Sequence, residues 1–413
     1  MNPASTGRQG TSQVLVVVAA PLDPEAPGIG GIATFVRGFV KYAPPDFDVA
    51  IVGVARTARL GVWRSVTLDG REVRHLPVAR PRTSQSRVPV SASFTLGLMR
   101  HARRIPRGGL LQFHRPATSL PLLGRRDPKV HVVHATGTSL VGPASESRWR
   151  RFARPLRLVE RLTLGRMNRV YVVNEAGADA YREAFPRLAD RIVYLPNWVD
   201  DAIFRPPDSK ARARIRREVR TQLGTVAQAA IVLYAARLES VKDPILAVRG
   251  AVTAMTGNPR LHLLICGDGA LRCAAEREAA DSGFRDRVSF IGHVSREALA
   301  RLMAAADCLL ITSHHETGPT VGLEALATGL PVVTTRVGTV AALIARSGAG
   351  AVVESRSPEA LASSLTAIVD ADVAVVRDAA ISAVEPHHAL RILPGLYDDT
   401  RALASAARVG RQR

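Results

Sequence analysis

Residues 308–334 read CLLITSHHETGPTVGLEALATGLPVVT. An apolar run ends in polar residues, Gly318–Pro319 opens a second segment, and Gly329 closes it before another apolar run. Proline is favoured in the first turn of a helix and glycine just past its end, so the middle segment predicts a helix near 319–328. The apolar runs at 308–312 and 332–334 predict strands buried on both faces. Strand, helix and strand in this order indicate a parallel α/β sheet.

The same alternation extends in both directions from this stretch. The second half predicts further strands at 231–235, 261–266, 288–291 and 351–353, with helices near 243–256, 270–282, 295–305, 338–346 and 357–369. The first half predicts strands at 14–20, 48–54, 110–114, 131–135 and 169–174. We therefore predict an α/β protein with two doubly wound, Rossmann-like parallel-sheet domains.

Prolines indicate where the domains meet. Leu195–Pro196–Asn197 and the Pro206–Pro207 pair predict a connection, because proline fixes its own φ and disfavours helix in the residue before it. The predicted domains are 1–195 and 196–385. Residues 386–413 are predicted to form a last helix with a basic tail. This helix could pack back on either domain, and the first domain is the one we name.

The composition favours a folded protein with ordinary cores. The 413 residues are 46% hydrophobic and 22% charged, which excludes a disordered chain or a fibrous repeat. The three cysteines lack metal-ligand spacing and are predicted to be core thiols in a reducing cytoplasm. No apolar stretch approaches the ~20 residues of a membrane-spanning helix, and residues 14–20 are interpreted as a strand rather than a signal segment. A cytoplasmic location is expected.

Positive charge is concentrated in the first half. Residues 1–200 hold 30 Lys and Arg against 14 Asp and Glu, whereas residues 201–413 hold 26 against 22. The net charge of +20 favours an anionic substrate, an anionic membrane or nucleic acid as partner. No zinc-ligand set or aromatic RNA-recognition pattern is present, and aromatic residues are only 5% of the chain, so nucleic acid is not expected.

Residues 147–169 combine apolar positions at near-helical spacing with many arginines. Such a basic amphipathic pattern is typical of a helix at an anionic membrane surface. The alternative is a helix that faces the core and exposes a solvated basic face. The pattern leads to the hypothesis of a peripheral membrane protein at the inner face of the plasma membrane.

A glycine-rich turn, Pro27–Gly31, follows the first predicted strand and precedes a helix. Glycine permits a close approach of the backbone to a ligand, and the N–H groups of a helix N-terminus favour phosphate. The turn lacks the third glycine of G-x-G-x-x-G. A tight turn without a ligand is the alternative.

Arg237 and Lys242 lie in the segment that follows the first predicted strand of the second domain. Ligands of open α/β sheets bind at the carboxyl ends of the strands, and two cations there could neutralise a diphosphate. Lys242 is one of only four lysines, so an arginine-rich composition does not account for it. A solvated basic loop is the alternative.

Glu316 and Glu324 flank the start of the helix predicted near 319–328. Glu316 is expected at the mouth of a cleft. A carboxylate within the apolar segment around Glu324 is costly to bury unless it accepts hydrogen bonds, and ribose hydroxyls are suitable donors. The free N–H groups of residues 317–321 are expected to face an anion.

In this order the segments resemble the retaining glycosyltransferases of family 4, which have the GT-B fold of two Rossmann-like domains facing across a cleft. The matching segments are the Gly30–Gly31 turn, the Arg237 and Lys242 loop, LPNWVD at 195–200, ICGDG at 265–269, FIGHV at 290–294, and Glu316 with Glu324. Asp243 stands where the family often has glycine after the lysine.

The resemblance implies roles for individual residues. Arg237 and Lys242 would bind the donor diphosphate, Glu316 the donor-sugar hydroxyls and Glu324 the ribose. His134 would lie beside the donor sugar, with His114 as the alternative for that role. Glu316, His134, Arg237 and Lys242 are the predicted catalytic residues. The other predicted donor-binding residues are Gly30, Gly31, His293, Val294, Thr317, Gly318, Pro319, Thr320 and Val321.

The resemblance also implies the reaction. A hexosyl unit would move, with retention of configuration and without a metal or other cofactor, from a nucleotide sugar such as a UDP- or GDP-sugar to a sugar or lipid-linked acceptor in cell-envelope or exopolysaccharide biosynthesis. The Asp-x-Asp segment Asp370–Ala371–Asp372 lies outside the candidate loops and is not expected to bind metal. An epimerase or a phosphorylase on the same scaffold remains the alternative.

Overall fold

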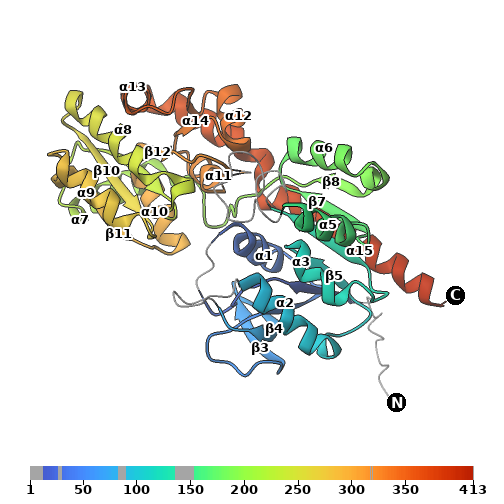
Figure 1. Cartoon of the computed structure of the whole chain (residues 1–413). Helices are drawn as coiled ribbons and strands as arrows, with labels where there is room; N and C mark the ends of the chain where they lie inside the picture. Colours follow the sequence, from blue (N-terminus) through green and yellow to red (C-terminus); the bar gives the residue numbers. More distant parts are fainter. Residues whose placement is uncertain are drawn as a thin grey trace, which may run out of the picture. The chain divides into compact units, whose positions relative to one another are not determined.

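The computed structural model describes residues 13–26, 30–81, 90–134, 153–316, 318 and 320–412. The chain divides into two compact units, Met1–Leu195 with Leu393–Arg413 and Pro196–Ile392 (Figure 1). The residues after Ile392 therefore belong to the unit that begins the chain, whereas the second unit is continuous in sequence.

The first unit is an α/β sheet whose described strands have the order β3-β4-β2-β1-β5-β6-β7-β8. Its strands are β1 (Val14–Ala19), β2 (Phe47–Val54), β3 (Arg64–Leu68), β4 (Arg71–Ala79), β5 (Leu110–Phe113), β6 (Lys129–Val133), β7 (Arg169–Val172) and β8 (Ile192–Tyr194). Its described helices are α1 (Gly31–Lys41), α2 (Val90–His101), η1 (Ala102–Arg104), α3 (Pro116–Ser119), η2 (Leu120–Leu122), α5 (Ala153–Leu164), α6 (Glu175–Ala184) and η4 (Pro186–Arg191).

One strand of this sheet corrects the prediction of purely parallel pairing, because β3 pairs antiparallel with β4. The two strands are joined at Asp69–Gly70, where both residues have positive φ, 48° and 82°. Such a two-residue turn matches the twist of a hairpin and favours Asp-Gly. A tight hairpin at the sheet edge reverses the chain without a crossover helix, so β3 runs against its neighbour.

The second unit is a parallel sheet in the order β11-β10-β9-β12-β13-β14. Its strands are β9 (Ala230–Ala235), β10 (Leu261–Cys266), β11 (Val288–Gly292), β12 (Cys308–Ile311), β13 (Val332–Thr335) and β14 (Gly350–Val353). Its helices are α7 (Ser209–Gln222), η5 (Ser240–Lys242), α8 (Pro244–Gly257), α9 (Arg272–Asp281), η6 (Arg285–Arg287), α10 (Arg296–Ala305), α11 (Thr320–Ala327), α12 (Gly338–Ser347), α13 (Pro358–Asp370), α14 (Val373–Val384) and η7 (Glu385–His387).

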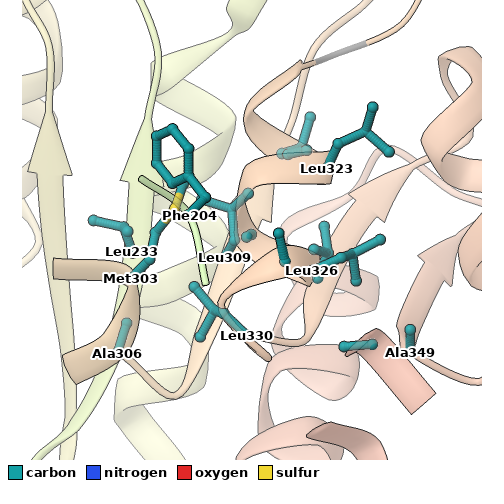
Figure 2. Packing of buried hydrophobic residues seen from close by; sticks show 14 of the residues in the cluster. Phe204, Leu233, Met303, Ala306, Leu309, Leu323, Leu326, Leu330 and Ala349 are labelled. Atoms are coloured by element: carbon teal, nitrogen blue, oxygen red, sulfur yellow. The ribbon is translucent and has the colours of Figure 1, made fainter. Parts of the chain in front are cut away.

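Each face of the second sheet has its own apolar core. One core joins the sheet to α8, α9 and α13, and the other joins it to α7, α10, α11, α12 and α14. Figure 2 shows Phe204, Leu309 and Leu326 packed together in the latter. Cys266 and Cys308 are buried in these cores, as predicted, but Cys273 is exposed on α9, so the prediction of a core thiol was wrong there. Cys273 faces water because the interior side of α9 is provided by Ala275 and Ala279.

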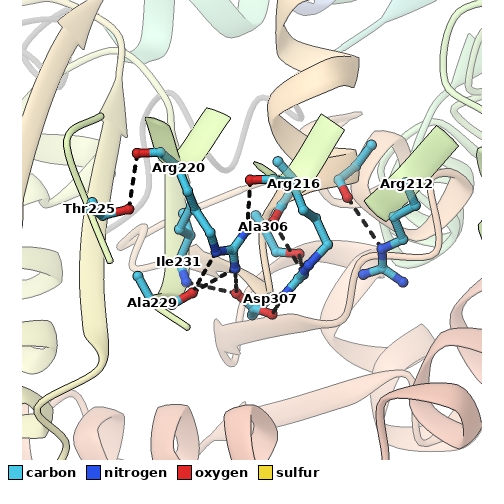
Figure 3. Close-up of polar contacts among 10 residues, drawn as sticks. Arg212, Arg216, Arg220, Thr225, Ala229, Ile231, Ala306 and Asp307 are labelled. Carbon is cyan, nitrogen blue, oxygen red and sulfur yellow. Dashed lines mark hydrogen bonds and ion pairs between the residues drawn. The ribbon is translucent and has the colours of Figure 1, made fainter. Parts of the chain in front are cut away.

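Three arginines one helical turn apart join α7 to the amino-terminal edge of the second sheet (Figure 3). Arg212 donates to the Ala304 carbonyl, and Arg216 and Arg220 donate to the carboxylate of Asp307 over 2.8 and 3.1 Å. Asp307 also accepts from the Ile231 N–H over 2.8 Å. Cations at a helix C-terminus stabilise its free carbonyls, so these guanidinium groups complete the end of α10.

The last helix, α15 (Ala389–Gln412), returns the chain to the first unit. The Tyr397 hydroxyl donates to the Phe39 carbonyl over 2.8 Å, and its ring packs against Phe39 and Phe47. Arg169 on β7 donates two hydrogen bonds to Asp399. The end of the chain therefore supplies part of the interior of the unit that the beginning builds.

Candidate active site

Lys242 and Glu316 meet at the point where the order of the second sheet reverses. Strand β9 lies between β10 and β12, so successive strands are added on one side up to β11 and on the other side from β12. Ligands of open α/β sheets bind at such a switch point, at the carboxyl ends of the strands. Lys242 follows β9 and Glu316 follows β12, and their side chains form an ion pair through Nζ and Oε1.

This pair is mostly shielded from water, with the Lys242 side chain 21% and the Glu316 side chain 13% exposed. The Ser313 hydroxyl donates to the same Glu316 oxygen over 2.8 Å. The Lys242 carbonyl accepts from Tyr234 and Thr312 over 2.9 and 3.0 Å. Main chain and side chain of Lys242 are both fixed, so its ammonium is preorganised at the switch point.

Asp243 explains how the chain turns after Lys242. Its φ of 48° lies in the left-handed region, where aspartate is tolerated better than most side chains. Its carboxylate caps α8 by accepting from the Leu246 N–H and pairs with Arg356 over 2.6 Å. Arg356 also donates to the carbonyls of Thr312 and Ser313. A glycine would also adopt this φ. Aspartate in addition caps α8 and, through Arg356, joins the loop after β9 to the loop after β12.

Arg237 lies on the same loop but apart from the Lys242–Glu316 pair. Its side chain is 53% exposed and pairs with Glu239 over 2.8 Å. The neighbouring backbone is tightly packed, because the Leu238 N–H donates to the Asp268 carbonyl over 2.9 Å. A Cβ on Gly269 would lie 2.5 Å from the Leu238 carbonyl oxygen, so the ICGDG segment needs glycine there for close backbone approach.

The segment before α11 is held by Asn197 of the LPNWVD motif. Its side-chain amide donates to the Gly318 carbonyl over 3.2 Å, and a Cβ on Gly318 would lie 2.5 Å from that nitrogen. Thr320 is the first residue of α11, and Val321 packs against the apolar core. The predicted residues Thr317 and Pro319 lie outside the described residues.

Glu324 lies inside α11 as predicted from the sequence, but its partner there is a cation. Its side chain is 9% exposed and lies 3.8 Å from Arg296, which also pairs with Asp200 over 3.3 Å. The Nε of Arg296 is buried without a hydrogen-bond partner in the described structure. Burial raises the pKa of Glu324 to about 7, and this effect outweighs the opposing attraction of Arg296.

Glu324→Gln should change how stability depends on pH. Because the native carboxyl binds its proton more tightly than the unfolded one, the contribution of Glu324 to wild-type stability is greatest below pH 4.5 and falls as pH rises through about 7. Glutamine removes this titration. Between pH 4.5 and about 7, the free energy of unfolding of the variant should therefore rise by about 3 kcal/mol relative to that of wild type. Urea unfolding at several pH values measures the difference.

The control for this prediction is Glu359→Gln, which replaces an exposed carboxylate on α13. Its stability difference from wild type should stay constant over the same interval. A constant difference for Glu324→Gln as well would contradict the buried, raised-pKa carboxyl.

His293 and Val294 follow β11 at the same edge of the sheet. His293 is exposed, and Val294 is partly buried against the apolar core. Gly292 before them has φ 73°, and its carbonyl accepts from the Gly267 N–H over 2.7 Å. The loops after β10 and β11 are therefore joined directly.

In the first unit the order of strands reverses between β1 and β5. Gly30, with φ 97°, precedes α1, and Gly31 is its first residue. The other residues of the predicted turn, 27–29, lie outside the described residues. His114 follows β5 and His134 follows β6, and their rings are hydrogen-bonded, so the two alternatives for the strand-end histidine form one pair.

Other sequence hypotheses concern metals and membranes. Among the described residues no group of three or more His, Cys, Asp and Glu side chains could hold a metal ion. Asp372 caps α14, and Asp370 pairs with Arg260. No helix in the described ranges is long and apolar enough to cross a bilayer. The amphipathic segment 147–169 is described from residue 153, as α5.

Two family models match most of the chain. Glycosyltransferase Family 4 matches residues 29–203, and Glycosyl transferases group 1 matches residues 215–379. The chain therefore belongs to the family 4, group 1 glycosyltransferases, and it has the two-unit α/β GT-B fold of that family.

Curated relatives are similar over part of their length. A D-inositol 3-phosphate glycosyltransferase of Acidothermus cellulolyticus is 32% identical over 52% of this chain and 49% of the relative. One from Corynebacterium kroppenstedtii is 31% identical over 60% of this chain and 55% of the relative. The chain thus spans about half the length of the curated relatives it matches.

Solved structures share the fold over nearly the whole chain. Sucrose-phosphate synthase from Thermosynechococcus elongatus has a TM-score of 0.75 at 21% identity, covering 95% of this chain and 100% of that one. WaaG, a glycosyltransferase involved in lipopolysaccharide biosynthesis, has a TM-score of 0.71 at 19% identity, covering 93% of this chain and 99% of that one. Anabaena HepE in complex with UDP and glucose has a TM-score of 0.69 at 18% identity, covering 93% of this chain and 98% of that one.

Four residues of the site escaped the sequence analysis: Ser313, Arg356, Arg296 and Asn197. The arginines are two among many in this chain and follow no spacing that distinguishes them. Asn197 lies in the LPNWVD segment that carried the resemblance, so its motif, but not its partner Gly318, was visible in the sequence.

Proposed function

We propose that the chain is a retaining glycosyltransferase that moves a hexosyl unit from a nucleoside-diphosphate sugar to a sugar or lipid-linked acceptor, in cell-envelope or exopolysaccharide biosynthesis. The observation that carries the proposal is the shielded Lys242–Glu316 pair at the switch point of the second sheet. A fixed cation beside a carboxylate suits a diphosphate attached to a hydroxyl-rich sugar.

In the proposed reaction the bond between the anomeric carbon and the diphosphate oxygen breaks, and an acceptor oxygen bonds to that carbon from the same face. The acceptor proton passes to the departing phosphate oxygen. Lys242 and Arg237 stabilise the developing negative charge, so we propose that a metal ion is not needed. Glu316 accepts hydrogen bonds from the sugar hydroxyls, and Glu324 from the ribose.

The names of similar proteins support this choice of substrates. The HepE complexes contain UDP, and one contains UDP-glucose, which supports a nucleotide-sugar donor here. The involvement of WaaG in lipopolysaccharide biosynthesis supports an acceptor in the cell envelope.

A thermal-shift screen of UDP-, GDP- and ADP-sugars tests the proposal. A ligand that binds only the native state raises the melting temperature as its concentration rises. One nucleotide sugar should give a saturable shift that Glu324→Ala weakens, and Glu359→Ala should leave it unchanged. The absence of any shift, or an equal shift in Glu324→Ala and wild type, would argue against a donor site in the second unit.

We further propose that the first unit works at an anionic membrane surface. In its described part, large apolar side chains are exposed at Leu96 and Met99 on α2, at Leu120, the first residue of η2, and at Leu158 and Leu162 on α5. We propose that they form one apolar face. Helix α3 packs against both α2 and α5, so these residues lie on neighbouring elements (Figure 1).

Charge supports a membrane as the partner of this apolar face. The described residues of α2, η1, α3, η2 and α5 include exposed arginines on α2 and α5 and one acid, Glu160. Glu160 pairs with the Tyr181 hydroxyl. Arginine near anionic lipid and leucine inserted at the interface both favour binding.

Leu96→Ser with Leu162→Ser should lower binding to vesicles of phosphatidylglycerol and phosphatidylcholine by about tenfold or more, because two apolar side chains no longer leave water. Co-sedimentation measures the bound fraction. Leu390→Ser is the matched control, because Leu390 is 63% exposed, close to the 68% of Leu96, but belongs to the second unit. Equal binding by the double variant and wild type, or no binding by wild type, would refute the membrane surface.

A further inference from the structure

The side chains of Gln112, His114 and His134 form a series of hydrogen bonds that ends at His134. The Gln112 amide nitrogen lies 3.1 Å from His114 Nε2, and His114 Nδ1 lies 2.9 Å from His134 Nε2. Gln112 and His114 are buried, at 1% and 3% exposure, and His134 is half-buried. Two buried polar groups therefore support one histidine that is accessible to a ligand.

The hydrogen bonds that link Gln112, His114 and His134 indicate which ring nitrogen of each histidine carries the proton. With the amide nitrogen of Gln112 facing it, Nε2 of His114 accepts and carries no proton, because an amide nitrogen can only donate. The proton of His114 is then on Nδ1, which donates to Nε2 of His134. Nε2 of His134 is thereby an acceptor, and the proton of His134 is on Nδ1. The partner of one imidazole nitrogen determines the state of the other.

Both rings are held in place and kept neutral. Phe35 on α1 packs edge-on against His114 and His134, with centroid distances of 5.2 Å to each. Burial lowers the pKa of His134 to about 3, assisted by His131 and Arg115. Burial also lowers the pKa of His114 well below its ordinary value, assisted by His134 and His131. With the Gln112 amide nitrogen facing Nε2 of His114, the neutral form of His114 avoids two N–H groups facing each other.

We infer that Gln112 and His114 are positioning residues that fix His134 as its Nδ1–H tautomer, so that His134 donates a hydrogen bond to an oxygen of the bound substrate and does not accept its proton. The substrate half of this inference rests on the proposed function, whereas the tautomer half does not. The partner that suits a neutral N–H donor is a sugar hydroxyl or a phosphate oxygen. His134 then orients the substrate, and the acceptor proton leaves by another route.

Nitrogen-15 NMR of histidine-labelled full-length protein tests the tautomer without any substrate. At pH 7 the His134 signals should show Nδ1 protonated and Nε2 bare. Gln112→Leu leaves both histidines in place but frees His114 to change tautomer, so the His134 signals should move toward the Nε2–H form. A wild-type His134 that is Nε2–H or doubly protonated would overturn the inference.

Kinetics with the donor found by the screen tests the functional half. His114→Leu should lower kcat about ten- to a hundredfold with little change in KM, because the loss is that of one oriented hydrogen bond. His114→Asn retains an N–H near the position of Nδ1 and should restore most of the rate. Equal losses in the leucine and asparagine variants would show a merely structural role and overturn the inference. A correct tautomer in a protein that binds no nucleotide sugar would instead contradict the proposed function.

Discussion

Lys242→Ala should lower kcat/KM about a hundred- to a thousandfold, because removing one preorganised group that stabilises developing charge costs about 3–4 kcal/mol of transition-state stabilisation. The structure shields Lys242 and holds its backbone carbonyl through Tyr234 and Thr312, so water cannot easily replace its ammonium. Steady-state kinetics with the identified donor measures the loss. Lys210→Ala, which removes an exposed lysine on α7, is the control and should leave the rate unchanged.

The ion pair with Glu316 complicates this experiment, because alanine at 242 leaves a shielded carboxylate without its cation. Glu316→Gln in the Lys242→Ala background removes that unpaired charge and should recover stability without recovering activity. Recovery of full activity in the double variant would show that Lys242 serves only to neutralise Glu316, and would contradict its role at the diphosphate.

Asp307→Ala should destabilise the second unit by about 3–5 kcal/mol, the cost of removing one partner of a buried ion pair. Asp307 accepts from Arg216, Arg220 and the Ile231 N–H, so alanine leaves two guanidinium groups without their counter-charge and a strand N–H without its acceptor. The Arg220 side chain, 5% exposed, cannot turn to water to compensate. Urea unfolding followed by circular dichroism measures the free energy of unfolding.

Asp370→Ala is the control for this prediction. Asp370 also pairs with an arginine, but both side chains are about half exposed, so the loss should be under about 1 kcal/mol. A loss of that size for Asp307→Ala would show that the arginines on α7 are hydrated in solution and that the end of α10 does not depend on them.

The sequence was most informative where one physical rule acted alone. Largely apolar runs predicted β10 with its observed bounds and β9 to within one residue, because strands buried on both faces need mostly apolar side chains. The β3–β4 hairpin escaped because β3, at the sheet edge, and the first half of β4 alternate polar and apolar residues and form no continuous apolar run. The Asp69–Gly70 turn was the signal that could have revealed it.

The site was predictable in its residue types but not in its pairings. The residues after β9 and β12 were both placed at the carboxyl edge of one sheet, and the ion pair between Lys242 and Glu316 follows from the adjacency of those two strands. No rule of sequence spacing indicates that Arg356, from the loop after β14, reaches Asp243. Such contacts depend on strand order, which the sequence alone did not supply.

The return of α15 to the first unit determines the order in which the protein can mature. Ribosomes synthesise residues 196–392 before the segment that contains Tyr397, so the continuous second unit can fold while the first is still incomplete. Until translation reaches that segment, the rings of Phe39 and Phe47 lack the cover that Tyr397 gives them. The first unit is therefore completed only after the whole second unit has been synthesised.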